Sequence, residues 1–387
     1  MSWIKLFALL SLSSSFGAIG AAQTTTFEGY PAVALSSDKL ELRLMMEGST
    51  LASIVLKADP EKLNPLWNPM RMARELGQPA HYDGGAGLFV CVDGFGPVSP
   101  EEKAAGLPMH GEAHRQIFEA ESKREGAIAS VTMRAKLPIV EEVFTRTFRV
   151  HDGESVVLVE SELDNELGFD RPVNWAEHAT IGSPFLESGA TVVDLSGSQS
   201  RTRPYDELLN GRTSRRLTSG QDFTWPLAPG LHGEAVDLRQ TPDNAGYLDH
   251  ATTLMDSNRD LEWATALNAK KGLLLGYIFK RAEYPWLQYW GNYPATGKFA
   301  RGMEFGTQPF DVSRREAVST GAMFGVPTYR WLPAHSKITS RFLVFYTLVP
   351  QGLQKVDDVH IENHQIIVED RSAHKTIRLP ATADLQP

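Results

Sequence analysis

The chain has 387 residues, of which 42% are hydrophobic and 22% are charged, and its formal net charge is -9. The hydrophobic fraction is that of a globular protein with a large buried core. The acidic balance argues against a nucleic-acid-binding protein, because contacts with a phosphate backbone need a basic surface. Cys91 is the only cysteine, so the chain cannot form an intramolecular disulfide. Its neighbours in GLFVCVDGF are apolar, and we expect it to lie buried in a strand.

The first 22 residues show the order of segments that is typical of a secretory signal peptide. Lys5 precedes an apolar stretch, and the small residues Gly20 and Ala22 close the segment. We predict cleavage after Ala22, with a mature chain from residue 23 that is exported to the periplasm or secreted. The alternative is an uncleaved anchor, although the apolar stretch is short and rich in serine for a membrane span. No later apolar run is long enough to cross a bilayer, so no membrane contact is expected of the mature chain.

Strand patterns dominate the rest of the chain. Apolar residues alternate with charged ones over residues 40–45. The clearest unit covers residues 144–163, in which two alternating runs flank Asp152-Gly153, a pair that strongly favours a hairpin turn. Residues 336–349 and 363–370 have the same strand-like composition.

Helical patterns are few and short. Residues 100–106 and 203–211 are each expected to form a helical turn or two. The 32 glycines and 23 prolines are spread along the chain, and no change of composition marks a linker or a repeat. Residues 23–387 are therefore predicted to form a single all-β domain, mostly antiparallel and built from two or more packed sheets.

The stretch LPMHGEAHR presents two histidines and a glutamate in a short segment. His110 and Glu112 would point the same way on an extended chain, as residues on the floor of a polar pocket do. His110 and His114 would share one face of a helix, as in a zinc site, but Pro108 and Gly111 favour a loop or a strand. No cysteine cluster accompanies them, so we predict no metal site; a hydrogen-bonded structural histidine is the other interpretation.

Three later stretches place polar residues beside apolar ones. His178 follows a strand-like segment in NWAEH, where an imidazole can exchange protons near neutral pH. Asp249 and His250 begin an apolar run in YLDHATTL. Glu304 lies between two apolar residues in GMEFG, where desolvation would raise the pKa of its carboxyl group and suit it to act as a base. A water-facing glutamate on an edge strand and a structural histidine are the alternatives.

The segment YPWLQYWGNYP concentrates aromatic residues. Rings such as those of Trp286 and Trp290 stack on the apolar faces of sugars, and their polar edges bond hydroxyl groups. The alternative is packing in the core of a large β domain.

In this order, the motifs resemble those of the aldose 1-epimerase (galactose mutarotase) superfamily. The motifs are MHGE with His110, NWAEH with His178, YLDH with Asp249 and MEFGTQ with Glu304, and the resemblance extends over roughly residues 35–350. It implies a large antiparallel β-supersandwich and an isomerase that interconverts the anomers of a monosaccharide or short saccharide. This reaction needs general acid–base catalysis but no redox step and no cofactor.

The resemblance also implies roles for individual residues. Glu304 would be the general base and His178 the general acid, while His110 and Asp249 would bind sugar hydroxyl groups. The further candidate sugar contacts, from the stacking and pocket-floor arguments above, are Trp286, Trp290 and Glu112. The chain departs from the family in two ways: the segment HYDGGAGLFVCVDGFGP before the His-Gly motif lacks the arginine that the family often has there, with Arg71 and Arg74 lying further back, and His-Gly-Glu replaces the commoner His-Gly-Gly. Both departures bear on the substrate rather than on the chemistry.

Two other functions are compatible with the sequence. One is a non-catalytic carbohydrate-binding protein on the same fold, since a fold does not fix a function. The other is a polysaccharide lyase or hydrolase, for which an arginine-rich segment could bind uronate carboxylates; a solvated basic loop is the alternative account of that segment. The arginines concerned are Arg201, Arg203, Arg212, Arg215 and Arg216. The sequence carries no signal for an oligomeric state.

Overall fold

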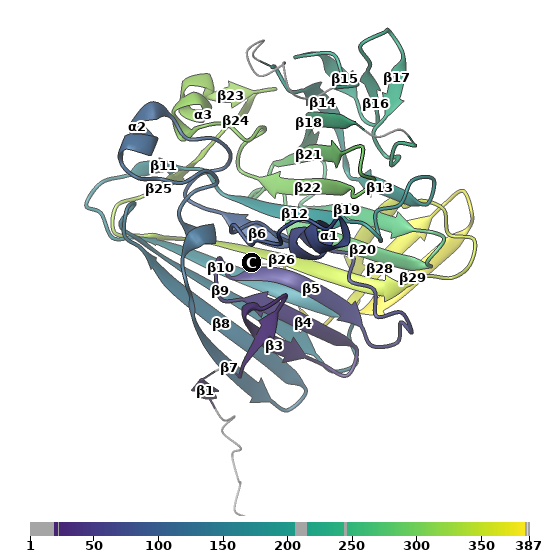
Figure 1. Ribbon diagram of the computed structural model, residues 1–387, viewed down its shortest axis with the longest axis horizontal. Helices are drawn as coiled ribbons and strands as arrows, with labels where there is room; N and C mark the ends of the chain where they lie inside the picture. Colours follow the sequence, from purple (N-terminus) through teal and green to yellow (C-terminus); the bar gives the residue numbers. More distant parts are fainter. Residues whose placement is uncertain (1–18, 22, 206–214, 244–245, 384, 386–387) are drawn as a thin grey trace, which may run out of the picture.

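The computed structural model describes residues 19–21, 23–205, 215–243, 246–383 and 385. Two large antiparallel sheets contain most of the strands, and they face each other as the two layers of a sandwich (Figure 1). The prediction of an all-β fold built from antiparallel sheets is therefore confirmed.

The first layer is a nine-stranded sheet. It contains the β9–β10 hairpin predicted from the Asp152-Gly153 turn, in which Val157 pairs with Val150. Gly153 has a φ of 91°, which suits this tight turn. In order across the sheet, the strands are β1 (Ile19–Ala21), β7 (Glu119–Glu125), β8 (Ile128–Leu137), β9 (Glu142–His151), β10 (Val156–Asn165), β26 (Lys337–Leu348), β20 (Leu273–Lys280), β19 (Leu261–Asn268) and β13 (Thr191–Leu195).

The second layer is an eleven-stranded sheet, in which strands from distant parts of the chain lie side by side. In order across the sheet, the strands are β15 (Asp222–Thr224), β14 (Gly197–Thr202), β18 (Tyr247–Met255), β21 (Trp286–Tyr293), β22 (Ala300–Gly306), β12 (Ala176–Gly182), β6 (Leu88–Cys91), β5 (Thr50–Leu56), β4 (Leu40–Met45), β3 (Tyr30–Ser36) and β2 (Thr24–Phe27).

One hydrophobic core fills the space between the two sheets. It includes Phe144 and Phe148 of β9 and Leu42 and Leu44 of β4, all of them 0% exposed. Alternation along each strand turns these side chains inward and sends their neighbours to the opposite face. The other face of the nine-stranded sheet is covered by the C-terminal sheet, which is yellow in Figure 1. Its strands are β27 (Asp358–Glu362), β28 (Gln365–Asp370) and β29 (Lys375–Pro380).

Shorter elements connect the main strands. The helix predicted at residues 100–106 is present as α2 (Pro100–Ala104), which starts with a capping box at Ser99. Most of the segment 203–211 lies outside the described residues. None of the helices in the described ranges is both long and apolar enough to cross a membrane. The other short elements are α1 (Pro69–Glu75), α3 (Arg314–Thr320), the 3₁₀ helix Ala113–Arg115, and the paired strands β11 (Arg171–Val173) with β25 (Arg330–Leu332), β16 (Leu227–Pro229) with β17 (Ala235–Asp237) and β23 (Ala322–Met323) with β24 (Val326–Pro327).

The strand β1 lies within the predicted signal peptide. It pairs with residues 121–123 of β7 at the edge of the nine-stranded sheet. Cleavage after Ala22 would remove β1 and leave β7 as the edge strand. The sequence of β7, EAESKRE, is rich in charges, as is typical of edge strands that are protected against aggregation. The cleavage itself stays a prediction.

Candidate active site

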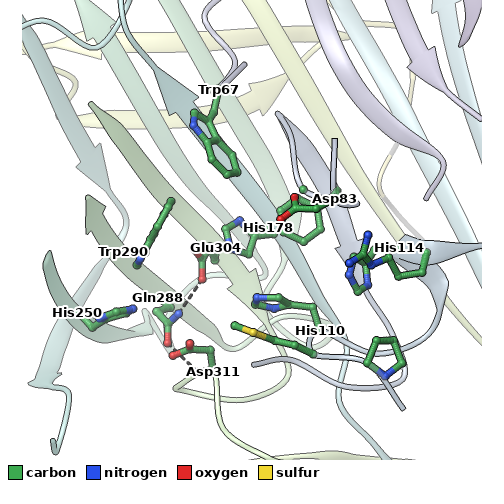
Figure 2. Close-up of a pocket in the computed structure, with 15 residues that line it drawn as sticks. Trp67, Asp83, His110, His114, His178, His250, Gln288, Trp290, Glu304 and Asp311 are labelled. Atoms are coloured by element: carbon green, nitrogen blue, oxygen red, sulfur yellow. Dashed lines mark hydrogen bonds and ion pairs between the residues drawn. The ribbon is translucent and has the colours of Figure 1, made fainter. Parts of the chain in front are cut away.

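A pocket of about 310 Å³ opens on the outer face of the eleven-stranded sheet (Figure 2). Five adjacent strands, β6, β12, β22, β21 and β18, supply its floor, and loops supply its walls. This volume is at the small end of the range for ligand pockets, about 300–1,000 Å³, and suits a small ligand. The lining residues are Trp67, Asp83, Gly85, Phe89, Pro108, Met109, His110, His114, Arg115, His178, His250, Gln288, Trp290, Glu304 and Asp311.

The strand register brings His178 and Glu304 together. Thr180 of β12 pairs with Gly302 of β22, so that His178 stands opposite Glu304. Side chains at facing positions of an antiparallel pair point to the same side of the sheet. His178 Nε2 and Glu304 Oε1 are 3.0 Å apart, and 9% and 1% of the two side chains are exposed. The two residues predicted to transfer protons thus form a buried pair on the pocket floor.

Glu304 is also held by the strand on its other side. Gln288 of β21, its pairing partner there, donates from Nε2 to Glu304 Oε2 over 2.7 Å. The backbone N–H of Asp311 donates to Gln288 Oε1 over 2.8 Å, which fixes the orientation of the amide (Figure 2). A methyl group on Gly302 would lie 2.9 Å from Glu304 Cδ and would displace the carboxylate, so the absence of a side chain at Gly302 leaves room for it. The carboxylate therefore has one defined position.

Burial changes the proton affinity of both groups. It raises the pKa of Glu304 to about 8, against the lowering effects of the Gln288 hydrogen bond and the Arg203 charge. Burial, reinforced by the nearby ring of His110, holds the pKa of His178 well below its usual range. Below about pH 8 the pair thus retains one proton, which the two pKa shifts place on Glu304 beside a neutral His178 ring. Such a pair can give a proton to one atom of a ligand and take a proton from another.

The imidazole of His178 has a fixed orientation. Its ring stacks on Phe89, the residue that pairs with it on β6, with ring centroids 4.2 Å apart and an angle of 19° between the planes. Its Nδ1 lies 2.8 Å from Thr180 Oγ1. These contacts direct Nε2 toward Glu304 and the pocket.

His110 enters the pocket from a sharp turn at the His-Gly motif. The φ angles are 67° at His110 and 81° at Gly111, and a side chain at Gly111 would come within 2.6 Å of the Val92 carbonyl carbon. The N–H of Gly96 donates to His110 Nδ1 over 3.3 Å, so the neutral ring carries its proton on Nε2. Burial lowers the pKa of His110 to about 4. The ring is therefore a neutral hydrogen-bond donor at neutral pH.

Two tryptophans form one wall of the pocket. Trp290 was predicted, and its ring meets that of Trp67 edge to face with centroids 5.8 Å apart (Figure 2). Trp67 comes from the loop before α1, and its backbone N–H donates to Thr180 O over 2.9 Å. The two indoles give a ligand an apolar surface.

Asp249, which was predicted to contact the sugar, does not line the pocket. Successive side chains of β18 point to opposite faces, so His250 faces the pocket and Asp249 the other side of the sheet. Asp249 is 0% exposed and accepts hydrogen bonds from the backbone N–H and the Nε of Arg216, over 2.8 and 2.7 Å. His250 takes the pocket position, with Nδ1 3.4 Å from the hydroxyl group of Tyr205.

Glu112 and Trp286 also lie outside the pocket, contrary to prediction. Around Glu112 the chain forms a turn and the 3₁₀ helix Ala113–Arg115, so the alternation expected of an extended strand does not hold. Glu112 is buried and accepts hydrogen bonds from the backbone N–H groups of residues 139 and 140, over 2.9 and 3.3 Å. Trp286 is the first residue of β21, before the pocket residues Gln288 and Trp290, and it packs against Phe310 in a separate hydrophobic cluster.

Several pocket residues were not selected from the sequence. Gln288 precedes Trp290 by two residues on one strand, so period 2 places both on one face, and this signal could have identified it. No comparable local signal marks the residues that loops carry into the pocket. The lining residues that were not selected as site residues are Trp67, Asp83, Gly85, Phe89, Pro108, Met109, His114, Arg115, His250, Gln288 and Asp311.

The arginine-rich segment is engaged with other side chains. Arg215 lies over the ring of Tyr205, 3.1 Å from its centroid, and Arg212 lies outside the described residues. The other arginines form ion pairs with carboxylates, which does not favour the uronate-binding interpretation. These ion pairs are Arg201–Asp222, Arg203–Asp311 and Arg216–Asp249.

Cys91 is buried, as predicted, and burial raises the pKa of its thiol well above the usual range. A thiol in this state is a poor nucleophile. Within the described ranges, no group of three or more histidine, cysteine, aspartate or glutamate side chains is arranged to hold a metal ion.

Comparison with known proteins identifies the fold. No protein-family model matches the chain, and no curated protein sequence matches it. A galactose mutarotase-like protein from Clostridium acetobutylicum is 13% identical, with 86% of this chain and 99% of that chain covered and a TM-score of 0.56. A galactose mutarotase related enzyme from Lactobacillus acidophilus is 12% identical, with coverages of 83% and 99% and a TM-score of 0.56. A protein from Klebsiella pneumoniae that is provisionally assigned as an aldose 1-epimerase is 15% identical, with coverages of 84% and 80% and the same TM-score.

At these identities the likeness concerns the fold. The chain has the β-supersandwich of galactose mutarotase-like proteins, as the resemblance of the motifs implied.

Proposed function

We propose that this protein is an aldose 1-epimerase, an isomerase that interconverts the α and β anomers of a sugar. One observation carries the proposal: Glu304 and His178 form a buried pair, with Oε1 and Nε2 3.0 Å apart, on the floor of a small pocket. Anomer interconversion needs one group that takes a proton and one that gives a proton. The galactose mutarotase-like fold supports the same reaction class.

In the proposed reaction, the sugar binds with its C1 hydroxyl group toward Glu304 and its ring oxygen O5 toward His178 Nε2. In the tautomer of the pair that carries its one proton on His178, the Glu304 carboxylate takes the proton of the C1 hydroxyl group, His178 gives its proton to O5, and the C1–O5 bond breaks. The resulting aldehyde rotates about the C1–C2 bond and presents its other face to O5. His178 then takes the proton back from O5, O5 attacks C1, and Glu304 returns its proton to the new C1 hydroxyl group.

The remainder of the pocket suits a neutral sugar ring. The indoles of Trp67 and Trp290 offer an apolar face, and the neutral ring of His110 offers an Nε2–H donor to a hydroxyl oxygen. Arg203, which lies beside the pocket, is paired with Asp311. We therefore propose a neutral monosaccharide, or the end of a short saccharide, rather than a sugar phosphate or a uronate.

We also propose that the enzyme is exported and that its mature form is one domain from residue 23 onward. The order of segments in residues 1–22 supports the proposal. N-terminal sequencing of secreted protein should find Gln23 as the first residue. A soluble cytoplasmic protein that retains Met1 would contradict it.

Polarimetry tests the proposed reaction. The protein should accelerate the mutarotation of freshly dissolved α-glucose or α-galactose, with a higher kcat/KM than for glucose 6-phosphate or glucuronate. Glu362→Gln, which alters an exposed carboxylate on β27, is the control and should behave as wild type. Sugar binding without acceleration would favour a non-catalytic carbohydrate-binding protein. Release of unsaturated products from a uronate polymer would favour a lyase.

A further inference from the structure

A buried ion pair lies directly behind His178. Glu177 precedes His178 on β12, and its side chain therefore points to the opposite side of the strand, into the core between the two sheets. There Glu177 Oε1 is 2.5 Å from Nη2 of Arg146, which belongs to β9 of the other sheet. Both side chains are 0% exposed.

Other polar groups surround the pair and connect several strands. Trp175 Nε1 and the hydroxyl group of Tyr284 both donate to Glu177 Oε1, over 3.1 and 3.3 Å. Arg146 Nε donates to Ser161 Oγ of β10 over 3.0 Å. The network thus fastens β12, at the residue next to His178, to two strands of the nine-stranded sheet.

Stability alone does not account for this arrangement. Removing two charges from water is costly, and well-packed apolar residues of the same volume often stabilise a core equally well or better. The pair is also incompletely bonded, because Arg146 Nη1 and Glu177 Oε2 have no hydrogen-bond partner among the described residues. The pair does provide a directional contact that fixes the distance between β12 and the nine-stranded sheet.

We propose that Glu177, held by Arg146, is a positioning residue for His178. By fixing the backbone of β12 beside His178, the pair sets the distance between His178 Nε2 and Glu304 Oε1 on the opposite face. The inference rests on the proposed function, because it concerns the acid of that reaction.

The test removes both charges together, since Glu177→Gln alone would leave Arg146 buried without a counter-ion. The double variant Arg146→Met/Glu177→Gln keeps the side-chain volumes and an acceptor for Trp175 and Tyr284. We expect it to fold, with kcat lowered about tenfold or more by misplacement of the acid and KM changed by less than about twofold. The basic limb of its pH profile should shift, because the pKa values of Glu304 and His178 depend on the distance between the two groups.

Glu262→Gln is the matched control. Glu262 is also a 0% exposed carboxylate, but it lies on β19 and bonds Ser196 Oγ over 2.6 Å, away from the pocket. The Glu262→Gln substitution should change the thermal stability of the protein without changing kcat or the pH profile. If the double variant does not fold, Arg146→Lys keeps the charge on a shorter side chain that cannot reproduce the guanidinium contact with Glu177. A lowered kcat at unchanged secondary structure would then support the same inference, and a wild-type kcat would contradict it.

A readout independent of turnover is the NMR signal of the His178 imidazole, assigned by its loss in His178→Asn. It should shift in the double variant and stay in place in Glu262→Gln. A folded double variant with wild-type kcat, pH profile and imidazole signal would overturn the positioning role while leaving the proposed function intact. If the wild-type protein accelerates no sugar, the proposed function fails, and the imidazole signal still decides whether Glu177 positions His178.

Discussion

Glu304 of β22 and His178 of β12 stand opposite each other on adjacent strands, and their side chains meet with 3.0 Å between Oε1 and Nε2. Each is also fixed from its far side, Glu304 by Gln288 and His178 by the ring of Phe89. The row Phe89, His178, Glu304, Gln288 thus runs across four strands of one sheet. A rigid sheet, rather than a mobile loop, therefore holds the two groups that the proposed reaction needs.

Glu304→Gln and His178→Asn should each lower kcat by at least about 10²-fold, the scale of a lost positioned proton transfer. Circular dichroism should show that both variants fold, and polarimetry gives the rates. Near-wild-type turnover in Glu304→Gln would mean that another group is the base.

The stability of Glu304→Gln provides a second measurement. Because the folded-state pKa of Glu304 is raised to about 8, the carboxyl group is least costly at low pH and destabilises the fold increasingly as pH rises toward 8. The amide has no such cost. The variant should therefore be more stable than wild type at pH 8–9, by about 1–3 kcal/mol, and thermal denaturation at pH 5 and pH 9 measures the difference. Equal stabilities at both pH values would show that the carboxyl group titrates normally.

The activity of the wild-type protein should depend on pH through the one proton that the Glu304–His178 pair retains. The pair loses this proton as pH rises through the raised pKa of Glu304, so kcat/KM should fall above about pH 8. At low pH the pair gains a second proton, but the pKa of His178 is held well below its usual range by burial. The acid limb should therefore lie well below pH 6.5, where an ordinary histidine would place it. A basic limb that persists in Glu304→Gln would assign it to a different group.

Gly302→Ala should disturb the base without disturbing the fold. Its backbone is not in the left-handed region, so alanine is tolerated there, but the added methyl group would overlap the carboxylate of Glu304. We expect kcat to fall about 10- to 10²-fold, as for a misplaced catalytic group, with little change in melting temperature. Gly168→Ala is the control, because its methyl group would meet only His335 Nε2, at an ordinary 3.5 Å. Wild-type kcat in Gly302→Ala would show that the position of the carboxylate is not critical.

Much of the fold could be predicted because the signals are local. The alternation of Phe144 and Phe148 with polar residues, and the Asp152-Gly153 turn, specify the β9–β10 hairpin without reference to the rest of the chain. Sheet order could not be predicted in the same way. The neighbours of β22 are β21 and β12, and β12 lies more than a hundred residues earlier in the sequence.

The same distinction applies to the site. Glu304 was identified because a carboxylate between apolar residues is conspicuous in the sequence, and Trp290 because it belongs to an aromatic cluster. Trp67 and Asp83 reach the pocket on loops whose path depends on tertiary contacts, so no local pattern marks them. Glu112 was misplaced because the turn at His110 abolishes the alternation of an extended strand.

The different positions of Asp249 and His250 lead to the last prediction. Because side chains alternate along β18, His250 points into the pocket and Asp249 points to the opposite face, where it pairs with Arg216. The two neighbours should therefore respond differently to substitution. His250→Asn should raise KM about tenfold, the scale of one lost hydrogen bond to a ligand, with a melting temperature close to that of wild type. Asp249→Asn should leave Arg216 without its counter-ion and lower the free energy of unfolding by about 3 kcal/mol, with KM changed by less than about twofold. Urea denaturation and polarimetric kinetics on both variants measure the two effects. A raised KM in folded Asp249→Asn, with an unchanged KM in His250→Asn, would mean that the aspartate, and not the histidine, contacts the sugar.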